Sequence, residues 1–185
     1  MNWITKLFPK DEVFDIEGMS MDKYRNTLLQ VDKSKSGKCY IPDGIQFIQE
    51  KALSDCIMLS NVYLPDSVLQ IQSYAFKGCT GLKSINIPPK VHYLHNGTFE
   101  GCVNLKELYV QCITPPICID DVVEYFPSNS EMKLCINHSK IKESSSCFAG
   151  IDMNQCILYI PKGSYELYSQ SEIWRQFTTI QELNL

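Results

Sequence analysis

The sequence predicts an α/β solenoid in which the short parallel strands of successive coils stack in register every 23 residues. Three observations predict it: a motif with a fixed period, alternation of apolar residues at one point of each copy, and a proline after each alternating stretch. A copy of roughly 20–50 residues cannot bury its apolar edge alone, so neighbouring copies must stack. Seven positions keep the 23-residue step through three copies: Ile41, Leu64 and Ile87; Pro42, Pro65 and Pro88; Ile45, Val68 and Val91; Ile48, Ile71 and Leu94; Leu53, Phe76 and Phe99; Cys56, Cys79 and Cys102; Leu59, Leu82 and Leu105.

The segment Ser84–Ile87 indicates the strand of one coil. Its residues Ile85 and Ile87 alternate with polar neighbours, which is the pattern of a strand with one buried face. Pro88 ends the strand because it has no backbone N–H to offer to a continuing sheet. By the same spacing, an earlier strand is expected to begin near Lys38.

After each strand the chain is expected to return across the core and turn. Val91 and Leu94 are assigned to the returning segment, and Thr98–Phe99 is predicted to form a tight helical turn. Gly101 then closes the coil. The core is therefore expected to consist of rows of equivalent side chains, one from each copy.

The repeat divides the chain into four segments. Residues 1–37 are expected to form an N-terminal cap and a first irregular coil, and residues 38–112 form the regular repeats. The sequence Thr114–Pro116 breaks the period, so residues 113–155 are interpreted as an irregular coil or an insertion. Residues 156–185 restore a strand followed by proline and then place apolar residues at mostly helical spacing, which predicts a C-terminal helical cap.

Composition and charge exclude several classes of function. Lys and Arg total 17 and Asp and Glu total 21, and this net charge of −4 argues against a nucleic-acid surface, which needs a basic face. There is no apolar run of about 18 residues, so no membrane span is expected. Residues 1–13 lack the continuous apolar stretch of a secretory signal. If Met1 is the native start, the protein is expected to be cytoplasmic.

The nine cysteines are interpreted mainly as core residues. Cys56, Cys79 and Cys102 share one position of the repeat, so we expect them to stack as small buried side chains. Neighbouring strands lie close enough for a disulfide, but matched positions rarely offer the dihedral angle that the bond requires.

A metal site near residues 112–156 is a second hypothesis for the remaining cysteines. Cys135 and His138 have the short spacing that zinc favours, with Cys147 and Cys156 as further ligands. The nine-residue step between Cys147 and Cys156 is longer than usual, so no metal is expected. No catalytic triad, metalloprotease motif or glycine-rich phosphate loop accompanies them, so neither an enzyme nor a cofactor is expected.

The outward side chains of the strands are the candidate binding residues. Because a strand alternates, the residues between the buried positions must face away from the core. Tyrosine recurs among them, and it is both a favoured interface residue and a good strand former, so both interpretations stay open. The outward row consists of Tyr40, Tyr63, Asn86, Tyr109 and Tyr159, and the companion row of Lys38, Asn61, Ser84 and Glu107.

The run YLPDSVLQIQSYAFKGCTGL, residues 63–82, resembles the BspA-like (Treponema pallidum type) class of leucine-rich repeats, which is marked by IPxxVxxIxxxAFxxCxxL. The ending LYIPKGSYELYSQSEIWRQFTTIQEL, residues 158–183, is similar to the C-terminal module that often closes these proteins. The resemblance covers residues 38–110 and 156–183. It implies a leucine-rich-repeat solenoid that is secreted or displayed on a cell surface, with adhesion to proteins or other cells as its usual role.

Three hypotheses for function follow. The first is a non-enzymatic adhesion module that recognises a protein or a glycan through the exposed strand face. The second is an intracellular or periplasmic scaffold that docks a partner protein, which the missing signal favours. The third is a small metal-dependent activity near residues 112–156.

Overall fold

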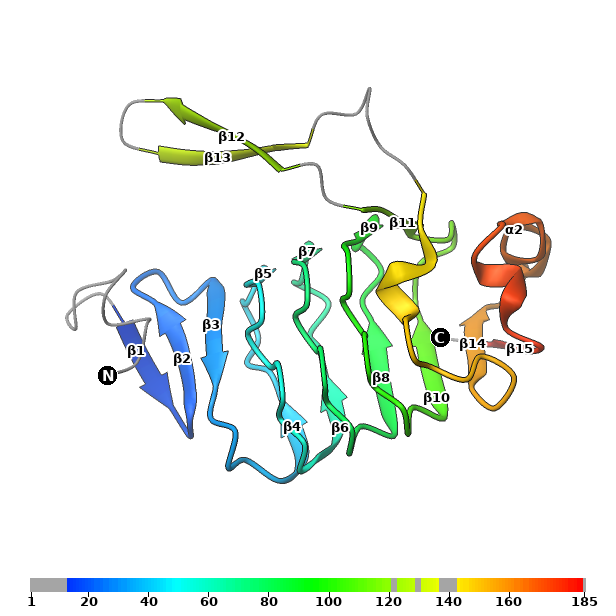
Figure 1. Cartoon of the computed structure of the whole chain (residues 1–185), viewed down its shortest axis with the longest axis horizontal. Coiled ribbons are helices and arrows are strands. Elements are labelled where there is room, and N and C mark those ends of the chain that lie inside the picture. Colours follow the sequence, from blue (N-terminus) through cyan, green and yellow to red (C-terminus); the bar gives the residue numbers. More distant parts are fainter. Residues whose placement is uncertain (1–12, 121–122, 129–130, 137–142, 185) are drawn as a thin grey trace.

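The computed structural model describes residues 13–120, 123–128, 131–136 and 143–184. Its coils stack side by side from the N-terminal to the C-terminal end, with a sheet along each of two sides (Figure 1). This confirms the predicted solenoid of short parallel strands with 23-residue spacing.

The larger strands form a six-stranded sheet with the order β15-β14-β10-β8-β6-β4, in which every pair is parallel. The 23-residue step sets its register, because Asn61 pairs with Ser84 and Ser84 with Glu107. The sheet supplies the strand face, which we define as its outward side. The strands are β4 (Gly37–Tyr40), β6 (Leu59–Tyr63), β8 (Ser84–Ile87), β10 (Glu107–Val110), β14 (Ile157–Pro161) and β15 (Thr179–Leu183).

A second sheet, which the sequence did not predict, runs along the opposite side in the order β1-β2-β3-β5-β7-β9-β11. Its repeating members are only two residues long, so they are too short to show alternation. Its N-terminal end is an antiparallel meander, in which Glu17 and Gly18 have φ of 51° and 75° and turn the chain from β1 into β2. The strands are β1 (Val13–Ile16), β2 (Met19–Asp22), β3 (Thr27–Val31), β5 (Phe47–Ile48), β7 (Gln70–Ile71), β9 (Tyr93–Leu94) and β11 (Ile117–Cys118).

The predicted helical turn at Thr98–Phe99 is wrong, because this side of the coil consists of successive tight turns. Thr98 N donates to His95 O at 3.1 Å and Cys102 N to Phe99 O at 3.1 Å, but the positive φ of Gly97, 61°, interrupts any helix. Other backbone groups bond to the neighbouring coil, as where Phe76 N donates to Thr98 O at 2.9 Å.

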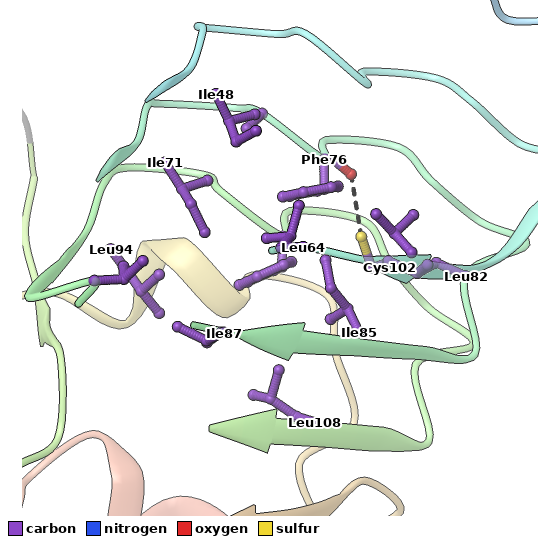
Figure 2. Close-up of a cluster of buried hydrophobic side chains, with 14 of the residues drawn as sticks. Ile48, Leu64, Ile71, Phe76, Leu82, Ile85, Ile87, Leu94, Cys102 and Leu108 are labelled. Carbon is purple, nitrogen blue, oxygen red and sulfur yellow. Dashed lines mark hydrogen bonds between the residues drawn. The ribbon is translucent and has the colours of Figure 1, made fainter. Parts of the chain in front are cut away.

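The core lies between the two sheets and is built from rows of equivalent side chains (Figure 2). One row stacks Phe76 on Phe99 with ring centroids 5.4 Å apart, and Phe99 on Phe148 at 5.9 Å. Trp174 and Phe177 of the C-terminal cap then meet Phe148 edge-on at 5.2 and 5.4 Å. The aromatic row therefore runs from the repeats into the cap without a break.

The C-terminal cap contains the short helix α2 (Tyr165–Gln170) and the 3-10 turn η4 (Trp174–Gln176). Two buried side chains fasten it to the last coils: the Tyr168 hydroxyl donates to Cys112 O at 2.7 Å, and Trp174 Nε1 donates to Pro116 O at 2.8 Å. The chain then adds β15 to the edge of the six-stranded sheet. The helical spacing of the tail did not predict this strand.

Residues 113–155 contain one more coil of the repeat, which is interrupted by a long insertion. The positions before and after this insertion match those of the preceding coil. Cys118 pairs with Leu94 in the second sheet, and Phe148 takes the position of Phe99 in the aromatic row. Phe99 follows Leu94 by five positions, whereas Phe148 follows Cys118 by thirty. An antiparallel bridge between Ile119 and Glu143 joins the two ends of the insertion. Between them lies the antiparallel pair β12 (Val123–Ser128) and β13 (Glu131–Ile136), and the turn η3 (Ser145–Phe148) follows.

The prediction that Cys56, Cys79 and Cys102 form a buried row of thiols is confirmed. Each thiol faces a carbonyl of the preceding coil: Cys79 Sγ donates to Leu53 O at 3.0 Å, and Cys102 Sγ to Phe76 O at 3.1 Å (Figure 2). Burial raises the pKa of Cys56 to about 11 and that of Cys102 to about 12, so both remain neutral thiols near neutral pH.

Replacing Phe99 by Ala should lower the free energy of unfolding by about 3–5 kcal/mol, because the cavity interrupts the aromatic row between two coils. Urea denaturation followed by circular dichroism measures this loss. Val103→Ala in the same coil is the matched control, since that side chain is 51% exposed. An equal effect of the two substitutions would contradict the described packing.

The buried thiols predict that stability falls at alkaline pH. The unfolded thiol ionises near pH 8.5, whereas the folded Cys102 stays protonated to about pH 12, so the unfolded chain binds fewer protons between these values. Cys102 alone should therefore lower the unfolding free energy by up to about 1.4 kcal/mol per pH unit above pH 9. Urea titrations from pH 8 to 10.5 should show a shallower fall in Cys102→Ala; the same slope in both proteins would count against a neutral buried thiol.

Candidate functional site

The structure places the predicted outward row along the strand face in register. Tyr40 pairs with Tyr63, and Tyr109 pairs with Asn86 on one side and Tyr159 on the other. Tyr40 and Tyr63 are 61% and 38% exposed. The residues preceding them in the strands point inward and are buried: Cys39, Val62, Ile85, Leu108 and Leu158.

The tyrosines of the outward row form two stacked pairs. The rings of Tyr40 and Tyr63 lie 4.6 Å apart between centroids and 9° from parallel, and those of Tyr109 and Tyr159 lie 4.5 Å apart, also at 9°. These spacings follow from the strand separation of about 4.8 Å, which brings equivalent side chains of adjacent strands into contact. Asn86 lies between the two pairs.

Asn86 differs from its neighbours because its side chain bonds to the sheet itself. Its Nδ2 donates to Leu64 O at 2.7 Å, and its Oδ1 accepts from Leu64 N at 2.8 Å. The amide thus replaces a main-chain pairing at the point where β6 ends. A side chain used in this way lies against the backbone, so the space between Tyr63 and Tyr109 is left open.

The companion row supplies the polar part of the same surface. Asn61 Nδ2 donates to Ser84 Oγ at 2.6 Å, and the Tyr109 hydroxyl donates to Glu107 Oε2 at 3.2 Å. Lys38, at the outer edge of the row, is exposed. Asn61 is therefore bonded to the adjacent strand, and Glu107 to a residue of its own strand.

Together the two rows enclose a hollow of about 420 Å³ above Asn86, which we name the Asn86 hollow. Its volume lies within the range of about 300–1,000 Å³ that is usual for ligand sites. Ten residues line it: Asn61, Val62, Tyr63, Leu64, Ser84, Ile85, Asn86, Glu107, Tyr109 and Gln111. Of the predicted site residues, Tyr63, Asn86, Tyr109, Asn61 and Glu107 meet here, whereas Tyr40 and Tyr159 stand behind them as the outer members of the stacks.

Gln111 is a residue of the hollow that the sequence reasoning missed. It occupies the position at which other coils carry Pro42, Pro65 and Pro88, and its backbone N–H donates to Ile87 O at 2.9 Å. Its Oε1 atom is buried and has no hydrogen-bond partner among the described residues. The sequence did contain a signal for this position, because glutamine replaces the proline of the other copies there.

The electrostatics of the hollow centre on the Tyr109–Glu107 pair. Burial, and then the negative charge of Glu107, raise the pKa of the Tyr109 hydroxyl to about 12. The hydroxyl therefore stays protonated and keeps donating to the carboxylate. Glu107 is the only charged residue that lines the hollow.

The residues of the metal hypothesis are dispersed where the structure describes them. Cys147 and Cys156 are buried in the core, whereas His138 and the side chain of Cys135 lie outside the described residues. In the described part of the chain, no three His, Cys, Asp or Glu side chains come together as a metal site. None of the described helices has the length and apolar character needed to cross a bilayer.

The Tyr109–Glu107 contact predicts a late ionisation. At pH 11 the Tyr109 phenol should still be protonated, whereas free tyrosine, with a pKa of about 10, is mostly ionised. Its contribution to stability should be complete below pH 10 and be lost as the pH rises through 12. NMR titration of ring-labelled tyrosine measures the midpoint, and Glu107→Gln should lower it in part, because burial remains. A wild-type midpoint near 10 is incompatible with this contact.

Several proteins of known structure share this fold. A leucine-rich cell surface protein of Faecalibacterium prausnitzii is 20% identical, covers 95% of this chain and 40% of its own, and superposes with a TM-score of 0.61. The pneumococcal vaccine antigen PcpA is 11% identical over 95% of this chain and 49% of its own, with a TM-score of 0.51. A leucine-rich repeat protein of Eubacterium ventriosum is 20% identical over 57% of this chain and 29% of its own, with a TM-score of 0.52.

These likenesses establish the fold, and the chain spans less than half of each of these structures. No curated protein matches the sequence. The model of the BspA type leucine rich repeat region matches six copies over residues 32–149, which is more than half of the chain. This chain therefore belongs to the BspA-type leucine-rich repeat family.

Proposed function

We propose that this chain is a non-enzymatic module that binds a partner protein through the strand face, in an adhesion-type role. The observation that carries the proposal is the Asn86 hollow, which lies between two stacked tyrosine pairs on an otherwise regular sheet. The family and its solved relatives, among them a cell surface protein and a vaccine antigen, support a binding role.

Tyrosine suits a protein interface for physical reasons. Its ring offers a large apolar surface at a low cost in conformational entropy, and its hydroxyl can still form a hydrogen bond. Stacking restrains the rings of Tyr63 and Tyr109 further, because each lies against a second ring. Restrained aromatic side chains around a hollow are typical of the residues that dominate binding energy.

A scaffold that docks a protein inside a cell would use the same face. The two hypotheses differ in the compartment of the partner and not in the surface that binds it. The surface can therefore be tested before the compartment is known.

The double substitution Tyr63→Ser and Tyr109→Ser should weaken binding of the partner at least about 30-fold, because the loss of a central aromatic contact commonly costs 2 kcal/mol or more. Proteins captured by the immobilised chain are identified first, and the affinity of one is then measured by surface plasmon resonance. Circular dichroism checks that the variant remains folded.

The matched control replaces Tyr24 and Tyr165, which are 73% and 51% exposed and lie outside the hollow. It removes the same number of tyrosines and should leave the affinity unchanged. The proposal fails if a captured partner binds the Tyr63/Tyr109 variant as tightly as the wild type, or if the control loses affinity equally.

A further inference from the structure

We propose that the Asn86 hollow receives a cationic side chain of the partner, an arginine in preference to a lysine. This inference rests on the proposed function and names the group that the strand face recognises. Three features carry it: the spacing of the two rings, the acceptors between them and the single carboxylate at their side.

The first feature is the width of the hollow. Tyr63 and Tyr109 belong to β6 and β10, which are separated by the single strand β8. Two strand spacings of about 4.8 Å place the rings roughly 9.6 Å apart, in agreement with the 4.6 and 4.5 Å found between adjacent rings. A cation midway lies about 4.8 Å from each ring, within the range of about 6 Å for cation–π attraction.

The second feature is a set of hydrogen-bond acceptors with remaining capacity. Gln111 lines the hollow, and its Oε1 is buried without a partner among the described residues, so it adds an unpaired acceptor beside the site and not one that is open to a ligand. Glu107 uses Oε2 to accept from Tyr109, and a carboxylate has further acceptor sites. Among the described residues the Oδ1 of Asn86 accepts from Leu64 N alone, so one of its lone pairs remains. A ligand that covers the remaining acceptor sites of Glu107 and Asn86 must bring donors, since an unpaired buried acceptor is costly.

The third feature is the charge of the lining. Glu107 is its only charged residue, and no described cation lies within ion-pair distance of that carboxylate. A cation that enters the hollow therefore meets a carboxylate without an ion-pair partner as well as the negative faces of two rings.

These features favour arginine over other groups. A guanidinium is planar, stacks on rings, carries five donors and no acceptor, and is less strongly hydrated than the ammonium of lysine. An aromatic side chain fits the width but leaves the acceptors unpaired. A sugar supplies donors that can bond to Glu107, but its uncharged hydroxyls gain less from the carboxylate and from the ring faces than a cation does.

The test uses two probes, N-acetyl-arginine amide and N-acetyl-citrulline amide, which have nearly the same shape but differ in charge. Each is titrated into the full ¹⁵N-labelled chain and followed by NMR. We expect the arginine probe to shift the amide signals of Asn86, Glu107 and Gln111, and to bind at least about tenfold more tightly than the citrulline probe.

Two variants localise the site. Glu107→Gln should weaken binding of the arginine probe about tenfold or more, whereas Glu172→Gln, which removes an exposed carboxylate of the C-terminal cap, should leave it unchanged. Asn86→Tyr, which fills the gap in the outward row, should abolish binding. Circular dichroism verifies the fold of each variant.

The outcomes separate this inference from the proposed function. Equal binding of the arginine and citrulline probes, stronger binding of a neutral methyl glycoside, or no shift near Asn86 overturns the cation site. If the Tyr63/Tyr109 variant nevertheless loses the partner, the strand-face function stands without it. If arginine binds in the hollow but the partner still binds that variant, the hollow binds a cation that the partner does not supply, and both the strand-face function and the assignment of the cation to the partner are overturned.

Discussion

Parallel pairing of successive coils in a constant 23-residue register is the constraint on which the rest of this structure depends. The pairing places each inward side chain against its equivalent in the next coil, so one apolar position in the repeat becomes a row of the core. The Phe76–Phe99–Phe148 row shows how far this reaches, because it continues beyond the regular repeats and ends against Trp174 and Phe177 of the cap. The cap is therefore part of the same core.

The same register also orders the outer surface. Equivalent outward positions of adjacent strands come into contact, and this is why four tyrosines form two stacked pairs. One residue that departs from the repeat changes the shape of this surface. The Asn86 side chain bonds to the backbone of Leu64 and does not project outward as a tyrosine does, so a hollow lies above it. Gln111 is a second departure, and it lines the same hollow. The repeat thus supplies the scaffold, and its exceptions supply the candidate site.

Sequence reasoning succeeded where a pattern was long enough to be recognised. Alternation and the following proline located β8 and the start of β4, and the row of equivalent cysteines was correctly assigned to the core. It failed for β5, β7, β9 and β11, whose two residues carry no alternation, and for β15, whose residues follow a helically spaced tail. The outward row could be named from register, but the hollow could not, because it depends on which hydrogen bonds the Asn86 amide forms.

The central claim is that the register of the repeat builds two tyrosine stacks separated by an open space above Asn86. Nuclear Overhauser effects between the rings of selectively labelled tyrosines test it most directly, because they report only short distances. The structure predicts strong effects between the ring protons of Tyr40 and Tyr63 and between those of Tyr109 and Tyr159, where the ring centroids lie 4.6 and 4.5 Å apart. It predicts no effect between the ring protons of Tyr63 and Tyr109. Strong effects between Tyr63 and Tyr109 would show that the hollow is closed and would contradict this account.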